Sequence, residues 1–142
     1  MEVDGEDIDM SEWEDRVAIN DVLARYADGV NRRDAALWSG TWDVDGEWFL
    51  FGPDTVRGRD AITAAWSQAM TGFPFVVMFA SQGEVVIEGD RARATSYTSE
   101  VARLADGTEM RVTGTYEDRY VKRDGRWGFS YRKFTPLHTQ TL

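Results

Sequence analysis

The sequence contains no cysteine, a single histidine (His138) and no apolar run long enough to span a bilayer. Without cysteine there can be no disulfide, no thiolate nucleophile and no cysteine-ligated zinc. One histidine cannot build a histidine metal cluster or a histidine-rich catalytic site. A membrane span would need about 20 apolar residues, and the acidic start is the reverse of the basic start of a signal peptide. We therefore expect a cytoplasmic protein without a metal or other cofactor.

Basic residues are also scarce, because 16 Lys and Arg stand against 25 Asp and Glu and the formal net charge is -9. Five of the acids fall within residues 1–10 without a base between them. Such a segment predicts a disordered, solvated acidic tail. Nucleic acids and anionic membranes are bound through cationic patches, so neither is an expected partner.

Residues 11–142 have the composition of one folded domain, since 42% of the whole chain is hydrophobic and 13% is aromatic. Ser11 and Glu14 form a capping-box pattern, and apolar residues then recur at helical spacing up to Val30. Asp34 can cap a short second helix that runs through Leu37, Trp38 and Trp42. A third helix is expected over residues 58–70.

Strand patterns fill the remainder of the domain. They predict strands near residues 47–51, 55–57, 75–88, 91–104, 111–123 and 126–134, with a turn at residues 52–54 and a break at Gly83. Helices followed by a long antiparallel meander predict an α+β fold, in which three N-terminal helices pack on the concave face of a strongly bent sheet. A bent sheet with helices on its concave face encloses a cone-shaped cavity.

The strands 111–123 and 126–134 meet at Asp124-Gly125, a strong hairpin signal. The length of the loop decides which residue faces Asp118, an acid among apolar and aromatic neighbours. A two-residue loop would pair Lys122 with Trp127 and set Asp118 opposite Tyr131.

A three-residue loop with Gly125 in a bulge gives a different register, which we favour because glycine readily adopts positive φ. It pairs Lys122 with Arg126, Asp118 with Ser130, and Tyr116 with Arg132. Tyr116, Asp118, Ser130, Arg132 and Phe134 would then share one surface. The opposite face would carry Trp127, Phe129 and Tyr131, and this aromatic area predicts a covering partner subunit.

Several motifs together resemble the SnoaL-like branch of the NTF2-like (cystatin-fold) superfamily. They are residues 18–26 (AINDVLARY), 31–34 (NRRD), 42–48 (WDVDGEW), 58–62 (GRDAI), 116–120 (YEDRY) and 124–127 (DGRW). The resemblance covers about residues 12–136. It implies the cone fold and a homodimer or homotrimer, while the superfamily includes lyases, isomerases, polyketide cyclases and non-catalytic binding domains.

The pattern is similar to that of scytalone dehydratase, bile-acid dehydratase and the dehydrochlorinases. The resemblance places Tyr26, Trp48 and Arg132 on pocket positions. The Asp/His dyad of those enzymes falls on Asn31 and Phe79, neither of which can transfer the proton.

A second comparison is with ketosteroid isomerase. There Tyr26 and Asp118 correspond to the two groups of the oxyanion hole, while Leu50 stands at the position of the base.

These observations predict a cofactor-independent lyase or isomerase that acts by acid/base catalysis on a small apolar cyclic carbonyl or hydroxy compound. Asp118 would move the proton, Tyr26 and Asn31 would hold the substrate oxygen, and Arg132 would balance charge. Trp48, Trp66, Phe79, Tyr116 and Phe134 would form the apolar wall.

Each of these residues also has a structural alternative. Asp118 can form an ion pair with Arg132 or with Arg119. Tyr26 can be a core residue and Asn31 can terminate the first helix. The alternative function is a non-catalytic module for small-molecule binding or dimerisation.

Overall fold

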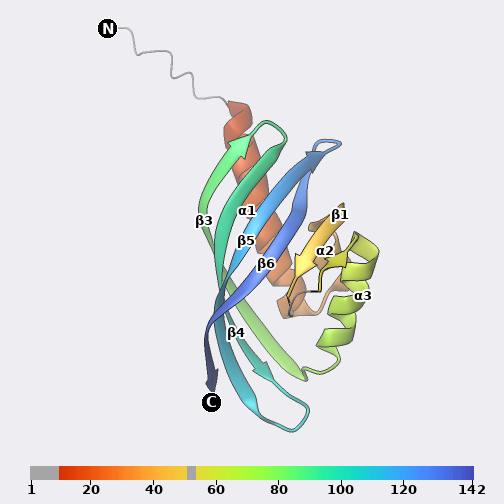
Figure 1. Ribbon diagram of the computed structural model, residues 1–142, viewed down its shortest axis with the longest axis vertical. Helices are drawn as coiled ribbons and strands as arrows, with labels where there is room; N and C mark the ends of the chain where they lie inside the picture. The colour runs from red at the N-terminus through yellow and green to blue at the C-terminus, as the bar shows by residue number, and fades with distance from the viewer. Residues whose placement is uncertain (1–9, 51–53) are drawn as a thin grey trace, which may run out of the picture.

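The computed structural model describes residues 10–50 and 54–142, and the predicted α+β fold is confirmed (Figure 1). The elements are α1 (Met10–Arg32), α2 (Ala35–Ser39), β1 (Trp42–Phe49), β2 (Val56–Arg57), α3 (Arg59–Met70), β3 (Phe75–Glu88), β4 (Arg91–Arg103), β5 (Glu109–Arg123) and β6 (Arg126–Thr141). Residues 1–9 of the predicted tail and residues 52–53 of the predicted turn lie outside the described residues. None of the described helices is long and apolar enough to cross a membrane, and the cytoplasmic location stays a prediction.

The six strands form one sheet in the order β2-β1-β6-β5-β4-β3. All neighbours are antiparallel except β1 and β6, which run parallel. The predicted break at Gly83 is confirmed as a register shift between Gln82 and Val85 in β3. Figure 1 shows the strands curving around the helices, which all lie on the same side of the sheet.

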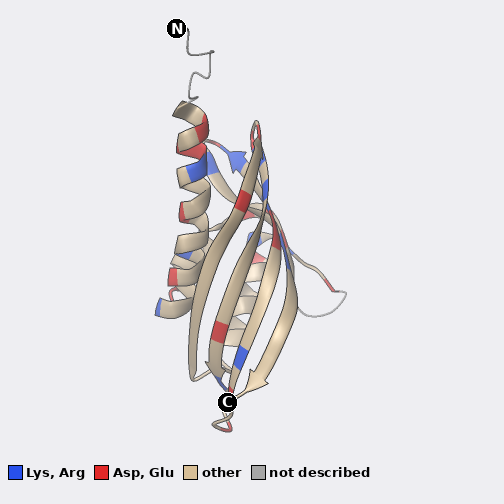
Figure 2. Cartoon of the chain, turned by 90° about the vertical axis from the view of Figure 1, so that its left-hand side faces the viewer, with Lys and Arg blue, Asp and Glu red and all other residues tan. Residues whose placement is uncertain are grey.

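Helix α1 buries the apolar stripe that its sequence predicts. Its buried residues are Ile19, Val22, Leu23, Tyr26, Gly29 and Val30. The polar side of α1 carries interspersed acidic and basic residues (Figure 2), including three ion pairs between residues four positions apart. Such exposed pairs contribute little to stability individually. The helix is therefore held mainly by the packing of its apolar face.

The short helix α2 begins as predicted, because Asp34 accepts a hydrogen bond at Oδ1 from the Leu37 amide, 3.0 Å away. It ends earlier than predicted. The chain turns at Gly40 and Thr41, whose hydroxyl donates to the Trp38 carbonyl at 2.6 Å. Trp42 consequently opens β1 and lies opposite Phe129 of β6.

The β5–β6 hairpin has a two-residue loop, so the three-residue register is wrong. Asp124 and Gly125 both have positive φ, 52° and 77°, and Lys122 lies opposite Trp127. Two successive residues with positive φ are typical of a type I′ turn, which matches the twist of the flanking strands. The left-handed conformation of Asp124, which aspartate tolerates better than most residues, makes the shorter loop possible.

A bulge farther along the hairpin changes the pairing again. Tyr120 lies opposite Phe129 and Arg119 opposite Tyr131, so Ser130 has no partner on β5. Beyond the bulge Asp118 faces Arg132 and Tyr116 faces Phe134. Neither of the two registers considered from the sequence contains these pairs. The bulge adds one residue to β6 but none to β5, and so it shifts the pairing beyond it.

The bulge also explains why the predicted aromatic outer face is wrong. Side chains before and after it can point to the same side of the sheet, so Phe129 and Arg132 are both fully buried. Trp127 is only 5% exposed, and its Nε1 donates to Asp15 of α1 at 2.8 Å. Only Tyr131 remains on the outer face, half-buried beneath Arg119 at 4.5 Å. This face therefore has no large aromatic area for a partner subunit to cover.

Candidate functional site

A cavity of about 430 Å³ lies between the inner face of the sheet and helices α1 and α3. Its wall is mostly apolar and takes residues from α1, β1, α3, β3, β4, β5 and β6. Five of the predicted site residues line it: Tyr26, Trp48, Trp66, Tyr116 and Phe134. Its size and lining suit a small apolar ligand held by a few polar groups.

Tryptophans that pack against one another form one part of the cavity wall. Trp66 of α3 lies parallel to the buried Trp38, with ring centroids 4.6 Å apart and an interplanar angle of 11°. Trp48 meets the same Trp38 ring edge-on at 5.4 Å. These contacts fix both cavity-lining indoles, so the pocket has one rigid aromatic side.

Glu100 is the one carboxylate in the described part of this wall. It lies on β4 opposite Val112 of β5. Burial raises the pKa of Glu100 to about 7, against a smaller lowering by the charge of Arg132. A carboxyl group with such a pKa can both accept and donate a proton near neutral pH.

The sequence reading missed Glu100, although a signal was present. Alternate residues of β4 from Ala92 to Thr98 are small and buried, and Glu100 continues this inward row. A charged residue at the next inward position is unusual in the same way as Asp118, which is an acid among apolar and aromatic neighbours. The inward direction of this row is certain only once the strand pairing is known.

Two tyrosines supply the other ionisable groups of the wall. The hydroxyls of Tyr26 and Tyr116 share a hydrogen bond, and both side chains are buried. Burial raises the pKa of Tyr26, and it raises the pKa of Tyr116 further. Both phenols therefore remain protonated at neutral pH. Because one hydroxyl donates to the other, one hydroxyl hydrogen of the pair is left to donate to a ligand oxygen.

Asp118 lies behind this wall in a fully buried ionic cluster. Arg132 donates to it from Nε to Oδ1 at 2.6 Å and from Nη2 to Oδ2 at 3.2 Å. The Ser96 hydroxyl donates to Asp118 Oδ2 at 2.8 Å and accepts from Arg132 Nη2 at 2.9 Å. Asp118 and Arg132 are 0% exposed and neither lines the cavity. The structure thus shows the ion pair that the sequence left open as an alternative.

Arg132 also contacts the aromatic groups around it. Its guanidinium carbon lies 3.6 Å from the ring centroid of Tyr116, 4.4 Å from that of Tyr26 and 4.3 Å from that of Phe129. Burial alone would lower the pKa of Arg132, but the charge of Asp118 raises it above its usual value. Arg132 therefore stays positive and attracts the faces of both tyrosines.

The two positions of the family dyad lie away from the cavity wall. Asn31 donates from Nδ2 to the Met78 carbonyl at 2.9 Å and accepts at Oδ1 from the Met78 amide at 2.7 Å. Phe79 is 68% exposed on β3 and does not line the cavity. Asn31 thus ties α1 to β3, and Phe79 is not part of the apolar wall that the sequence predicted.

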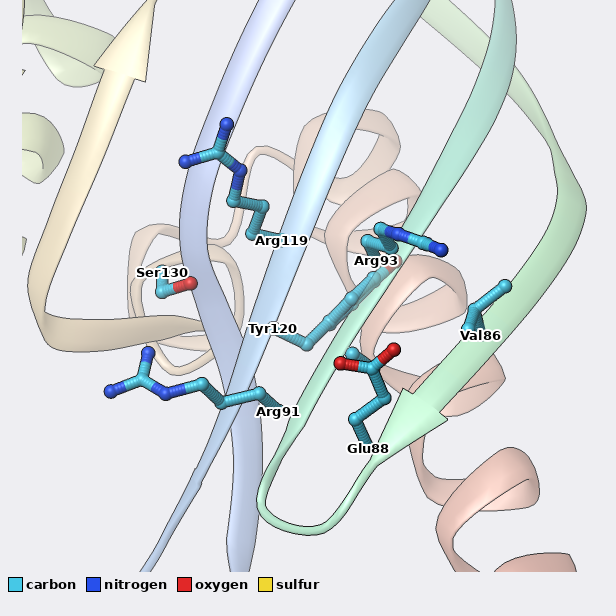
Figure 3. A pocket seen from close by; sticks show the side chains of 8 residues that line it. Val86, Glu88, Arg91, Arg93, Arg119, Tyr120 and Ser130 are labelled. Carbon is cyan, nitrogen blue, oxygen red and sulfur yellow. The ribbon is translucent and has the colours of Figure 1, made fainter.

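A second, smaller hollow of about 180 Å³ lies on the sheet beside β4, β5 and β6. Figure 3 shows the guanidinium groups of Arg91 and Arg119 extending to the same side, with Ser130 between them, while the Glu88 carboxylate lies apart from them. The lining of this hollow thus carries charges of both signs. Across residues 10–50 and 54–142 there is also no group of three His, Asp or Glu side chains placed to hold a metal ion.

The chain belongs to the SnoaL-like domain family, whose model matches residues 11–133. It is 24% identical to the gamma-hexachlorocyclohexane dehydrochlorinase of Sphingobium indicum over 137 residues, 91% of this chain and 88% of that protein. The dehydrochlorinase LinA-type3 of Novosphingobium barchaimii superposes with a TM-score of 0.85 at 20% identity, over 94% of each chain.

An NTF2-like protein with a cystatin-like fold from Novosphingobium aromaticivorans superposes with a TM-score of 0.76 at 26% identity. The match covers 90% of this chain and 85% of that one. These similarities establish the NTF2-like cone fold and a distant relationship to a lyase. They do not establish a substrate.

Proposed function

We propose that the protein is a cofactor-independent lyase or isomerase that transfers a proton on a small, apolar cyclic carbonyl or hydroxy compound. The supporting observation is the cavity itself, in which one carboxyl group with a pKa of about 7 shares an apolar wall with two protonated phenols. Perturbed ionisable groups in such a cavity are typical of acid/base sites.

In this proposal Glu100 takes the role that the sequence gave to Asp118. The Glu100 carboxylate accepts a proton from a carbon next to the substrate carbonyl, and the C–H electron pair forms the enolate double bond. Of the hydrogen-bonded pair Tyr26 and Tyr116, one phenol donates to the enolate oxygen and the other donates to that phenol. Where a C=C bond is conjugated with the enolate, return of the proton from Glu100 to the far carbon of that bond completes an isomerisation. Where a β-hydroxyl group is present, the enolate re-forms the carbonyl as this group takes the proton from Glu100 and leaves as water, which completes an elimination.

Arg132 supports this site from behind the wall. Its positive charge lies against the faces of Tyr26 and Tyr116 and opposes the rise in their pKa values. It thereby makes the hydroxyl that donates to the substrate oxygen a stronger donor to a developing negative charge. Asp118 holds the guanidinium in this position.

A direct test is hydrogen exchange at carbon in D2O, with cyclohexanone and 2-tetralone as probes. We expect the protein to accelerate loss of the α-proton NMR signal and Glu100→Gln to remove this acceleration, while ligand-induced thermal shifts persist. Glu117→Gln is the matched control on the exposed side of β5 and should exchange like wild type. Exchange at the wild-type rate in Glu100→Gln would remove Glu100 from the mechanism.

The second candidate is the non-catalytic binding module. It is favoured by the positions of Asn31 and Phe79, neither of which can transfer a proton into the cavity. Thermal stabilisation by the probes without any acceleration of exchange would support this function instead.

We also propose a homo-oligomer, homodimer or homotrimer, now on a different surface from the one the sequence indicated. Phe79 of β3 and Tyr97 of β4 are 68% and 51% exposed on adjacent strands, since Ser81 lies opposite Tyr97 and Phe79 opposite Ser99. Sedimentation should give more than one chain per particle, and Phe79→Ser should shift it toward monomer. A monomeric wild-type protein would refute the proposal.

A further inference from the structure

Phe134 covers a position on β5 that has no side chain. Gly114 is buried on the inner face of β5, opposite Pro136 of β6. A Cβ atom on Gly114 would lie 2.5 Å from both Cε2 and Cζ of Phe134, closer than real contacts allow. The ring of Phe134 therefore leans across the neighbouring strand into the space that any other residue at 114 would occupy.

The same ring is part of the cavity wall. Phe134 lines the cavity and packs against Tyr116, with ring centroids 5.0 Å apart. Pro136 and Val112 line the cavity on either side of Gly114. If the ring were lifted from Gly114, the open space beside it would be the cavity, because Tyr116 blocks the other direction along β5.

We propose that Gly114 and Phe134 together determine the size of ring system that the cavity accepts. Glycine lets the Phe134 ring lie flat on β5 and leaves the remaining volume to the ligand. This inference rests on the proposed function for the identity of the site, but not on proton transfer. Two substitutions should move the size preference in opposite directions, which a purely structural role of either residue would not do.

Phe134→Ala removes the ring from the wall and enlarges the cavity, whereas Gly114→Ala pushes the ring into it. Binding of cyclohexanone, with one ring, and of 2-tetralone, with two fused rings, can be measured by quenching of tryptophan fluorescence. We expect Phe134→Ala to raise the affinity ratio in favour of 2-tetralone by about tenfold, and Gly114→Ala to lower it by about as much.

The double variant shows whether Gly114 acts through Phe134. With the ring absent, the next nearest atom to the added methyl group is the Thr135 carbonyl oxygen, 2.7 Å away. The added methyl group then has no ring to push into the cavity, so the ratio should return toward that of Phe134→Ala. Phe75→Ala is the matched control, because this exposed phenylalanine lies outside the cavity wall. If Gly114→Ala does not fold, Phe134→Ala against Phe75→Ala still decides the outcome.

Three results overturn the inference in distinguishable ways. If Phe134→Ala binds both ketones as the wild type does, with an unchanged affinity ratio, the Phe134 ring does not determine the size preference. The proposed function is not affected by this result. A lowered ratio that is the same in Gly114→Ala and in the double variant refutes the action of Gly114 through Phe134. Binding of neither ketone to the wild-type protein would refute the proposed function as well, whereas altered ratios without any exchange activity would refute only that function.

Discussion

Glu100 and Asp118 are inward-facing acids on neighbouring strands, yet their surroundings differ in every respect that matters for chemistry. Asp118 is fully buried and receives hydrogen bonds from Arg132 and Ser96. Glu100 lines an apolar cavity, and burial raises its pKa to about 7. A carboxylate whose hydrogen bonds are all satisfied by the fold, like that of Asp118, stabilises the structure. Glu100 faces a cavity and has no ion-pair partner among the residues that the structure describes, so its carboxyl group is available for proton transfer.

The largest effect is expected at the ionic cluster. Asp118→Asn leaves the charge of Arg132 buried without its counterion, and the free energy of unfolding should fall by about 3–5 kcal/mol. Denaturant unfolding near pH 7 measures this loss. Glu117→Gln is the control on the same strand, because its ion pair with Arg119 is exposed and 3.8 Å long, and it should change stability by less than about 1 kcal/mol. Equal effects of the two substitutions would contradict the structural role of Asp118.

A smaller effect of opposite sign is expected at Glu100. Its pKa is raised above the usual 4.5, so the folded state binds more protons than the unfolded state between about pH 4.5 and 7. Its contribution to stability is therefore lost as the pH rises through this window. Glu100→Gln should remove this dependence and make the protein more stable above pH 7 by on the order of 2 kcal/mol.

Unfolding curves of both proteins at pH 5 and pH 8 measure this difference. A Glu100→Gln variant that is less stable than wild type at pH 8 would show that the carboxylate has a favourable partner.

The smallest effect is expected at the edge of the ionic cluster. Ser96→Ala removes the hydroxyl that bridges Asp118 and Arg132 but leaves the ion pair intact. The free energy of unfolding should fall by about 1–2 kcal/mol, because the hydroxyl makes two buried hydrogen bonds, one to each partner. Thr95→Ala on the exposed side of β4 is the control. A loss as large as that of Asp118→Asn would show that the hydroxyl, and not the charge of Arg132, determines the stability of the cluster.

Much of the fold could be predicted from the sequence because its signals are local. The apolar stripe of α1, the cap at Asp34 and the turn residues between strands each act within a few positions. The aromatic residues Tyr26, Trp48 and Trp66 lie in the cavity wall for the same reason, since helical and strand periodicity determine their faces.

The site was harder to predict because a bulge has no strong local signal. One unpaired residue, Ser130, reverses the alternation of β6 and brings Arg132 opposite Asp118. Strict alternation on β6 therefore misassigned Trp127 and Phe129 to the outer face. The resemblance to dehydratases could not predict Glu100 either. It indicates the dyad positions Asn31 and Phe79, and Glu100 corresponds to neither of them.

A measurement of the pKa of Glu100 tests most directly whether this carboxyl group transfers a proton in the cavity. Carbon-detected NMR of the side-chain carboxyl groups, titrated from pH 4 to pH 9 in the full chain, can follow it, and Glu100→Gln identifies its signal. We predict a titration midpoint at about pH 7, shifted by binding of 2-tetralone. A midpoint near the ordinary value for glutamate, about 4.3, with no response to the ligand, would contradict the proposal that this carboxyl group transfers a proton in the cavity.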